Sequence, residues 1–315
     1  CSGLTSIHIP KSVTSIKSDA FSYCDGVTSI TVDPQNPVFD SREDCNAIVE
    51  TATNTLFTGC KNTVIPKNVT KIGSCAFCGC TGLTAVTIPD GITSIEFYAF
   101  RECNGLISID IPQSVTSIME YAFMFCEGLV SVNIPEGITS IENNAFYGCS
   151  ALTSVRIPSS VSNIETEAFG GCSSLASIVV DPANTKYDSR KKCNAIIETA
   201  SNTLIAGCKN TVIPKGVTCI GPSAFYSCSD LSKVTIPDGV TKIWYEAFRG
   251  CSSLKKINIP SSVTEIGPSA FYDCDGLTVI TVDKKNITFD SRENCNAIIE
   301  TASNTLIQGC KKTVI

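Results

Sequence analysis

Histidine is nearly absent from this chain of 315 residues, which contains one histidine, one tryptophan and two methionines. A metal centre with several histidine ligands is therefore excluded, and a Ser–His–Asp triad has only His8 as its base. Charged residues make up 17% of the chain, below the roughly one quarter that is usual in globular proteins. The surface must therefore consist largely of Ser, Thr and Asn.

Long apolar runs and an excess of positive charge are missing as well. No run approaches the roughly 18–20 residues that a membrane-spanning helix needs, so we expect neither a membrane span nor a signal peptide within these 315 residues. The net charge of −6 argues against nucleic acid as a partner, because phosphate binding requires a basic face. Both ends fall inside a repeat, so we expect the chain to be a fragment of a longer protein.

The most abundant feature is repetition. Ala-Phe and Ile-Pro pairs recur with a common spacing of 23 residues, in the consensus C-x-x-L-x-x-I-x-I-P-x-x-V-T-x-I-x-x-x-A-F-x-x. Counted from the Leu position, thirteen repeats are separated by nine intervals of 23 residues and three of 33. The longer intervals predict ordinary repeats extended by ten residues, at 27–59, 175–207 and 277–309.

Each repeat predicts the same local structure. The alternation in L-x-x-I-x-I indicates a half-buried strand that ends at the proline. The segment V-x-x-I indicates a second short extended piece, and Ala-Phe indicates a tight helical turn. One repeat cannot bury its apolar side alone, but stacked repeats share a continuous core. We expect a single solenoid over residues 1–315 whose core holds the repeated phenylalanines: Phe21, Phe77, Phe100, Phe123, Phe146, Phe169, Phe225, Phe248 and Phe271.

The consensus resembles the BspA-like, or Treponema-type, leucine-rich repeat surface proteins, and so do the extended repeats with their Cys-Asn-Ala-Ile segments at 45–48, 193–196 and 295–298. The resemblance implies a leucine-rich repeat solenoid, mostly β, with short stacked parallel strands. It also implies a secreted or surface-anchored adhesion protein of a host-associated anaerobic bacterium or a parasitic protist. Some family members bind host matrix or plasma proteins, most have no assigned function, and no catalytic motif comes with the family.

The nineteen cysteines divide into several groups. Those of the repeat slot should form a ladder of buried thiols, because parallel Cβ vectors on stacked strands fit disulfide geometry poorly. A hairpin at residues 50–55 would bring two cysteines of an extended repeat opposite each other, so that either a disulfide or plain burial results; the pairs are Cys45–Cys60, Cys193–Cys208 and Cys295–Cys310. The ladder consists of Cys1, Cys24, Cys80, Cys103, Cys126, Cys149, Cys172, Cys228, Cys251 and Cys274.

Two further patterns could indicate a metal or redox site. Cys75 and Cys78 form a C-x-x-C, but no second such pair completes a zinc site, so coincidence is the simpler interpretation. The Asp-Ser-Arg segments at 40–42, 188–190 and 290–292 offer oxygen ligands for calcium, or an Asx-type turn with a local ion pair. We expect neither a metal nor a cofactor.

A partner would find its best anchors among the aromatic residues. The outward positions of the main strands are small and uncharged, whereas Tyr and Trp gather beside the Ala-Phe turns and are enriched at protein interfaces. These rings either bind a partner or shield the turns. The candidates for partner binding are Tyr98, Tyr121, Tyr147, Tyr226, Trp244, Tyr245 and Tyr272.

Together these features predict a monomeric, non-enzymatic module that binds a protein ligand at a cell surface or in the extracellular space. No nucleophile elbow, P-loop or dinucleotide fingerprint is present to suggest an enzyme. The alternative is a purely structural spacer that carries another domain.

Overall fold

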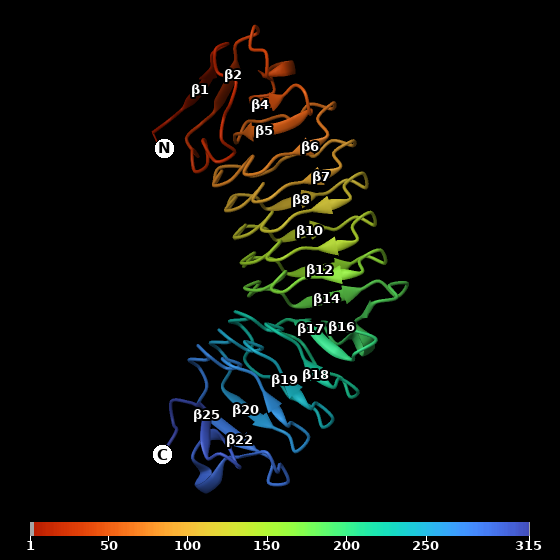
Figure 1. The fold of residues 1–315 in the computed structure, drawn as a ribbon, viewed down its shortest axis with the longest axis vertical. Coiled ribbons are helices and arrows are strands. Elements are labelled where there is room, and N and C mark those ends of the chain that lie inside the picture. The colour runs from red at the N-terminus through yellow and green to blue at the C-terminus, as the bar shows by residue number, and fades with distance from the viewer. Residues whose placement is uncertain (1–2, 315) are drawn as a thin grey trace. The chain divides into compact units, whose positions relative to one another are not determined.

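Each 23-residue repeat forms one rung. The rung of residues 106–128 contains a main strand near its start and a second, two-residue strand before the Ala-Phe turn, whereas some other rungs contain only one of these two strands. The computed structural model describes residues 3–314 and separates two compact units, Cys1–Phe169 and Gly170–Ile315. Figure 1 shows successive rungs within each unit, for example β6, β7, β8 and β10 in the first. The chain is therefore built from stacked parallel strands, as the repeat predicts.

The first unit contains main strands, second strands and one extended repeat. Equivalent strands pair in parallel at a separation of one repeat, as when Ile7 lies opposite Ile30. The main strands are β1 (Ser6–Ile9), β2 (Ser29–Val32), β8 (Ser108–Asp110), β10 (Ser131–Asn133) and β12 (Ser154–Ile157). The second strands are β6 (Lys71–Ile72), β7 (Ser94–Ile95), β9 (Ser117–Ile118), β11 (Ser140–Ile141) and β13 (Asn163–Ile164). The extended repeat holds β3 (Phe39–Asp40), η1 (Arg42–Asp44), β4 (Ala47–Glu50) and β5 (Thr55–Gly59).

The second unit repeats this plan with two extended repeats. Its main strands are β14 (Ser177–Val180), β20 (Lys256–Ile259) and β22 (Val279–Val282), and its second strands are β18 (Cys219–Ile220), β19 (Lys242–Ile243) and β21 (Glu265–Ile266). One extended repeat holds β15 (Tyr187–Asp188), η2 (Arg190–Lys192), β16 (Ala195–Glu198) and β17 (Thr203–Gly207). The other holds β23 (Phe289–Asp290), η3 (Arg292–Asn294), β24 (Ala297–Glu300) and β25 (Thr305–Gly309).

The ten extra residues of an extended repeat form an antiparallel hairpin. In the first unit β4 pairs with β5, and β5 then pairs in parallel with β6, so the hairpin begins the ladder of second strands. The expected register holds at Glu50–Thr55 and Val49–Leu56 but shifts by one residue at a bulge between Ile48 and Val49. Beyond that bulge the one-to-one pairing that would set Cys45 directly opposite Cys60 is lost.

The Ala-Phe segment is a series of β-turns rather than the helical turn that the sequence predicts. In the rung of Phe100, the N–H groups of Ala99 and Cys103 donate to carbonyls three residues earlier. Tyr98 and Glu102, each the third residue of such a turn, have φ angles of 58° and 57°. A positive φ at this position breaks the helical path and is what a type II turn requires.

The turns are also bonded from rung to rung. The N–H of Phe100 donates to the carbonyl of Ala122 at 2.8 Å, and the N–H of Phe123 to that of Ala145 at 2.8 Å. These bonds satisfy backbone groups that the irregular turn would otherwise leave unpaired beside the core. They also hold the phenylalanine side chains of neighbouring rungs in the same orientation.

Stacked phenylalanine rings run through the core of each unit. Phe123 is fully buried, and its ring lies 5.2 Å from that of Phe100 and 5.3 Å from that of Phe146, with planes within 1° of parallel. Phe77 and Phe169 extend this stack in the first unit. In the second unit Phe225, Phe248 and Phe271 stack with centroid distances of 4.9 and 5.3 Å and are buried. Phe21 is only partly buried and packs against a separate cluster that includes Phe39 and Ile48.

The repeat cysteines are present as thiols, and several donate to a neighbouring rung. The Sγ–H of Cys103 points to the carbonyl of Phe77 at 3.1 Å, and that of Cys251 to the carbonyl of Phe225 at 3.2 Å. The same bond is made by Cys126, Cys149 and Cys274. A small apolar side chain with a weak donor suits this slot, which explains why cysteine recurs there. Cys1, at the start of the ladder, lies outside the described residues.

Candidate functional site

The aromatic residues that flank the Ala-Phe turns form a surface along each unit that we call the turn edge. In the first unit it includes Tyr98 and Tyr121, which occupy the same position, two residues before the phenylalanine, in consecutive rungs. Both have positive φ, 58° and 61°, a conformation that costs a residue with a Cβ about 1–2 kcal/mol. Their rings stack at 4.8 Å with planes 8° apart.

A cation already lies on this stack. The guanidinium carbon of Arg101 is 5.5 Å from the centre of the Tyr98 ring, a cation–π distance. Arg101 also pairs with Glu102 at 3.0 Å, and the hydroxyl of Tyr23 donates to the same carboxylate at 2.9 Å. Burial and this hydrogen bond raise the pKa of Tyr23, so its hydroxyl stays protonated. The rings are therefore held by charged neighbours.

The third candidate of the first unit, Tyr147, lies apart from this stack. Its ring meets that of Phe125 edge-on, with centroids 5.4 Å apart and planes at 76°. Phe97, directly before Tyr98, is 38% exposed. The first turn edge therefore carries two aromatic groups.

In the second unit one arginine joins two of the predicted tyrosines. Tyr226, Arg249 and Tyr272 each follow the repeat phenylalanine in three successive rungs, and the guanidinium carbon lies 5.5 Å from one ring and 5.2 Å from the other. Arg249 also forms an ion pair with Glu246. The tyrosine at 272 is 54% exposed, so one face of this sandwich is open to a partner.

Trp244 and Tyr245 make a second group on the same unit. Their rings meet edge-on at 6.3 Å, and each residue is 40% exposed. The ammonium of Lys242 lies 5.8 Å from the Trp244 ring and pairs with Glu265 at 2.8 Å. Large, preorganised rings with a polar tip are the usual anchors of protein interfaces.

The structure therefore assigns the seven predicted residues to two units and to small groups within each. What the sequence reasoning missed is the cations on the rings, namely Arg101, Lys242 and Arg249. The alignment of the repeats contains the signal for one of them, because Arg249 occupies the same repeat position as the tyrosines of the rungs before and after it.

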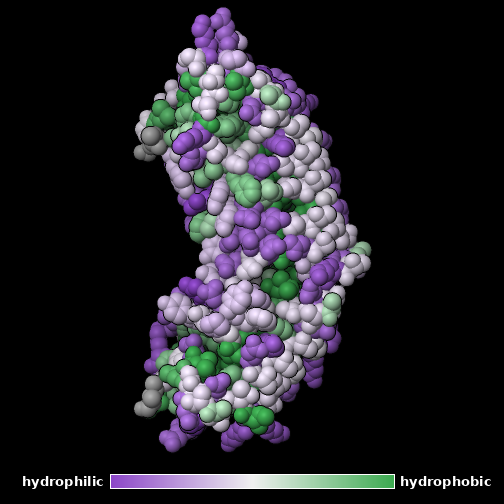
Figure 2. Space-filling model, viewed as in Figure 1, coloured by the Kyte–Doolittle hydropathy of each residue, from purple (hydrophilic) through white to green (hydrophobic). Residues whose placement is uncertain are grey.

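The strand face exposes aliphatic residues, whereas the turn edge exposes aromatic ones. Ile107 and Val130, one residue after the Leu position, are 54% and 40% exposed. A shallow depression of about 470 Å³ on this side is lined by residues that include Val64, Ala85 and Pro89. Figure 2 shows that, on the face in view, hydrophobic residues appear as separate patches among polar and neutral ones. Within residues 3–314, the outward positions of the strand face, two and four residues after the Leu position, hold no Phe, Tyr or Trp.

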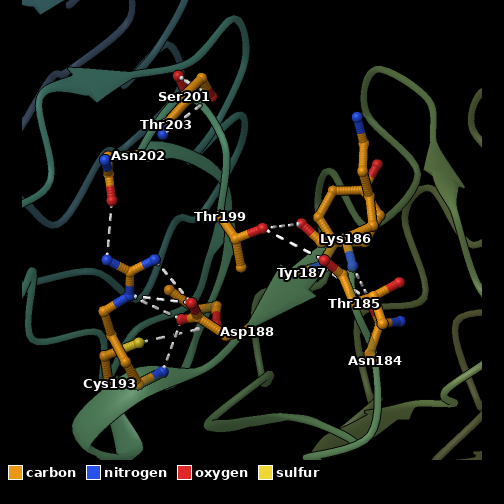
Figure 3. Close-up of polar contacts among 12 residues, drawn as sticks. Asn184, Thr185, Lys186, Tyr187, Asp188, Cys193, Thr199, Ser201, Asn202 and Thr203 are labelled. Carbon is orange, nitrogen blue, oxygen red and sulfur yellow. Dashed lines mark hydrogen bonds and ion pairs between the residues drawn. The ribbon is translucent and has the colours of Figure 1, made fainter.

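The hairpins of the extended repeats are held by an ion-pair network. In the second unit the guanidinium of Arg190 donates to both carboxylate oxygens of Asp188, at 2.6–3.0 Å, and to the side-chain oxygen of Asn202 at 2.9 Å. Figure 3 shows these contacts of Asp188 and Asn202. Although burial raises the pKa of Asp188, the bonds from Arg190 bring it below its usual value. In the other two extended repeats, Asp40 pairs with Arg42 and Asp290 pairs with Arg292.

This network is the local ion pair that the Asp-Ser-Arg segments predict. Each aspartate oxygen that a cation would need already accepts from a guanidinium. Among residues 3–314, no three His, Cys, Asp or Glu side chains are placed to hold a metal together.

The paired cysteines of the extended repeats are thiols with separate hydrogen-bond partners. The Sγ of Cys45 contacts the carbonyl of Ala47 at 3.7 Å, and that of Cys60 the carbonyl of Asn46 at 3.5 Å. Cys193 and Cys208 have equivalent contacts, and so does Cys310. Disulfides at Cys45–Cys60, Cys193–Cys208 and Cys295–Cys310 stay predictions.

Comparisons with known proteins agree with this architecture. The family described as "BspA type Leucine rich repeat region" matches residues 1–42, 50–187 and 199–306, in six copies. A leucine-rich cell surface protein of Faecalibacterium prausnitzii has a similar solved structure, with 29% identity, a TM-score of 0.58, and coverage of 90% of this chain and 74% of that one. No protein with a curated description matches the chain.

Two more distant structures share the fold. A leucine-rich repeat protein of Eubacterium ventriosum is 24% identical, with a TM-score of 0.55 and coverage of 78% of this chain and 70% of the other. The pneumococcal vaccine antigen PcpA is 19% identical, with a TM-score of 0.56 and coverage of 90% and 73%. Within the part of the chain that the structure describes, no helix has the length and apolar character to cross a membrane.

Proposed function

Because the chain belongs to the BspA-type leucine-rich repeat family, we propose that it is a non-enzymatic protein-binding module that serves adhesion at a bacterial cell surface. The solved relative from Faecalibacterium prausnitzii is described as a cell surface protein, which supports this location. A host matrix or plasma protein is the class of ligand that we propose, bound by a monomer.

The observation that carries the proposal is the exposure of preorganised aromatic rings along the turn edges. Tyr272, Trp244 and Tyr245 keep 40–54% of their surface exposed while neighbouring cations and rings hold them in place. A side chain that is already ordered loses little conformational entropy on binding, which leaves more of the contact energy for affinity. A surface that only shielded the turns would not need exposed rings.

The second candidate function is a structural spacer, which the regular stacking of the rungs supports. It predicts a rigid, stable module without affinity for a ligand. We expect the two functions to be separated by a binding screen of the 315-residue chain on arrayed matrix and plasma proteins. Saturable binding that is lost with the folded structure supports the adhesion module, whereas absence of binding across the array supports the spacer.

A further inference from the structure

The turn at Cys75 and Cys78 carries two cysteines where the other rungs carry none. Cys75 occupies the position two residues before the repeat phenylalanine, and Cys78 the position after it. In the eight other Ala-Phe turns these positions hold Asp, Tyr, Asn, Glu or Ser before the phenylalanine and Ser, Arg, Met, Tyr or Gly after it. Neither cysteine belongs to the ladder of the repeat slot.

The turn brings the Cα atoms of the two cysteines within the range of a disulfide. The N–H of Cys78 donates to the carbonyl of Cys75 at 3.1 Å, which closes a four-residue turn. The ends of such a turn lie within about 7 Å of each other between Cα atoms, and disulfides span about 4.4–6.8 Å. The Cys78 thiol is also close enough to raise the pKa of the Cys75 thiol. The two cysteines are therefore neighbours within one turn, at a Cα separation that a disulfide can span.

The two sulfurs differ in access. Cys75 is partly exposed, whereas Cys78 is 7% exposed. The ladder thiols contrast with both, because Cys103 and Cys126, for example, are completely buried and donate to phenylalanine carbonyls. An oxidant from solution therefore reaches Cys75 first, and Cys78 is placed to resolve the product.

We propose that Cys75 and Cys78 form a redox site that exchanges with low-molecular-weight disulfides. The thiolate of Cys75, having released its proton to solvent, attacks one sulfur of the disulfide and expels the first thiol. Cys78 then loses its proton and attacks the Cys75 sulfur, which breaks the mixed disulfide and releases the second thiol. Two electrons pass from the cysteine pair to the reagent, which is reduced to two thiols.

Burial and charged neighbours shift the pKa of both thiols, and the pKa governs how much reactive thiolate is present. Burial raises the pKa of both thiols, and the nearby Asp19 raises that of Cys75 further, whereas Arg101 lowers both. Tyr23 and Glu102 also face Cys78. Because the thiolate is the nucleophile, we expect slow exchange at neutral pH that accelerates as the solution becomes alkaline.

The site borders the first turn edge, although the redox proposal does not depend on ligand binding. The N–H of Cys75 donates to the carbonyl of Phe97 at 3.0 Å, next to Tyr98 of the aromatic stack. A disulfide would fix the turn against which this stack begins.

Peptide mass analysis tests the proposal. The folded chain is incubated with oxidised glutathione, its remaining thiols are alkylated under denaturing conditions, and it is cleaved with trypsin without reductant. The peptide 72–101 contains Cys75, Cys78 and Cys80 and no other cysteine. We expect this peptide to lose the mass of two hydrogen atoms and to carry a single alkyl group. After reduction and a second alkylation it should carry three alkyl groups.

Variants assign the bond. Cys80→Ser is the matched control and should still lose two hydrogen atoms, whereas Cys75→Ser and Cys78→Ser should lose none. Full alkylation of the wild-type peptide after oxidation, or equal disulfide formation in Cys75→Ser, would overturn the proposal. So would oxidation of the ladder cysteines at the same rate. Circular dichroism identifies any variant that fails to fold. If Cys75→Ser or Cys78→Ser fails to fold, the results for the wild type and Cys80→Ser still decide the proposal.

Discussion

The thiol of Cys126 donates to the main-chain carbonyl of Phe100 in the preceding rung, with sulfur and oxygen 2.9 Å apart. Phe100 in turn receives a backbone hydrogen bond from the N–H of Cys103 on its own rung at 3.1 Å. One carbonyl thus joins its turn to the cysteine of the next rung. The cysteine ladder therefore takes part in stacking as well as filling space.

Replacing Cys126 with alanine should lower the free energy of unfolding by about 1–2 kcal/mol. The change removes a completely buried sulfur and leaves the second lone pair of a buried carbonyl without its donor. Urea denaturation in the presence of a reductant measures the loss. Cys75→Ala is the matched control, because Cys75 is partly exposed, and should cost about 0.5 kcal/mol or less. Equal losses in the two variants would contradict a role for the ladder bond.

Phe123→Ala should be far more damaging, at about 3–5 kcal/mol, because it opens a cavity in the middle of a five-ring stack. Phe125→Ala, two residues away on the partly exposed turn edge, removes the same ring from the surface and is the control. The two midpoints of urea denaturation should differ clearly. If they coincide, the stack does not contribute to stability in the way its burial indicates.

Stability should fall steeply in alkaline solution. Burial raises the pKa of Cys126 from 9.0 to about 12, and it does the same for Cys80, Cys228 and Cys274. A group whose pKa is higher in the folded state contributes stability that is complete below the unfolded pKa and is lost as pH rises toward the folded value. The loss therefore begins near pH 9 and continues to about pH 12, at about 1.4 kcal/mol per pH unit for each such thiol.

The measurement is the unfolding free energy between pH 7 and pH 10 with reductant present. Cys126→Ala should show a shallower decline than the wild type, because one proton fewer is released on unfolding. Identical slopes for the two proteins would mean that Cys126 is not buried as a protonated thiol.

The sequence predicts the fold because the same physical constraint recurs in every repeat. The Leu position recurs thirteen times and the repeat phenylalanine nine times, and each recurrence identifies the same buried face, so that the errors of a single repeat cancel. The conformation of the Ala-Phe turn was not predictable in this way. It depends on a positive φ at residues such as Tyr98 and Glu102, whose side chains do not favour that region as glycine does.

The candidate site follows from the sequence less completely. Aromatic residues beside the turn are visible in the repeat alignment, but their grouping depends on which rungs are neighbours and on side-chain direction. The cation–π contact of Arg249 with two rings needs three rungs in register. The bulge in the hairpin, which shifts the register beyond Val49, has no sequence signature that we recognise.

The sharpest test of the binding surface compares two sets of substitutions. Replacing Tyr98, Tyr121, Tyr147 and Trp244 with serine should weaken binding of a protein ligand found in the array more than replacing Ser108, Ser131 and Ser154 with alanine. Buried aromatic anchors commonly contribute about 2 kcal/mol or more each, whereas small polar contacts are near neutral. The affinities are measured by surface plasmon resonance on variants that keep the wild-type circular dichroism spectrum and melting temperature. If replacing Ser108, Ser131 and Ser154 with alanine has the larger effect, the ligand lies on the strand face. If neither set matters, the hairpin tips at Ala52, Ala200 and Ala302 become the surface to test, because the aromatic rings would then serve the turns alone.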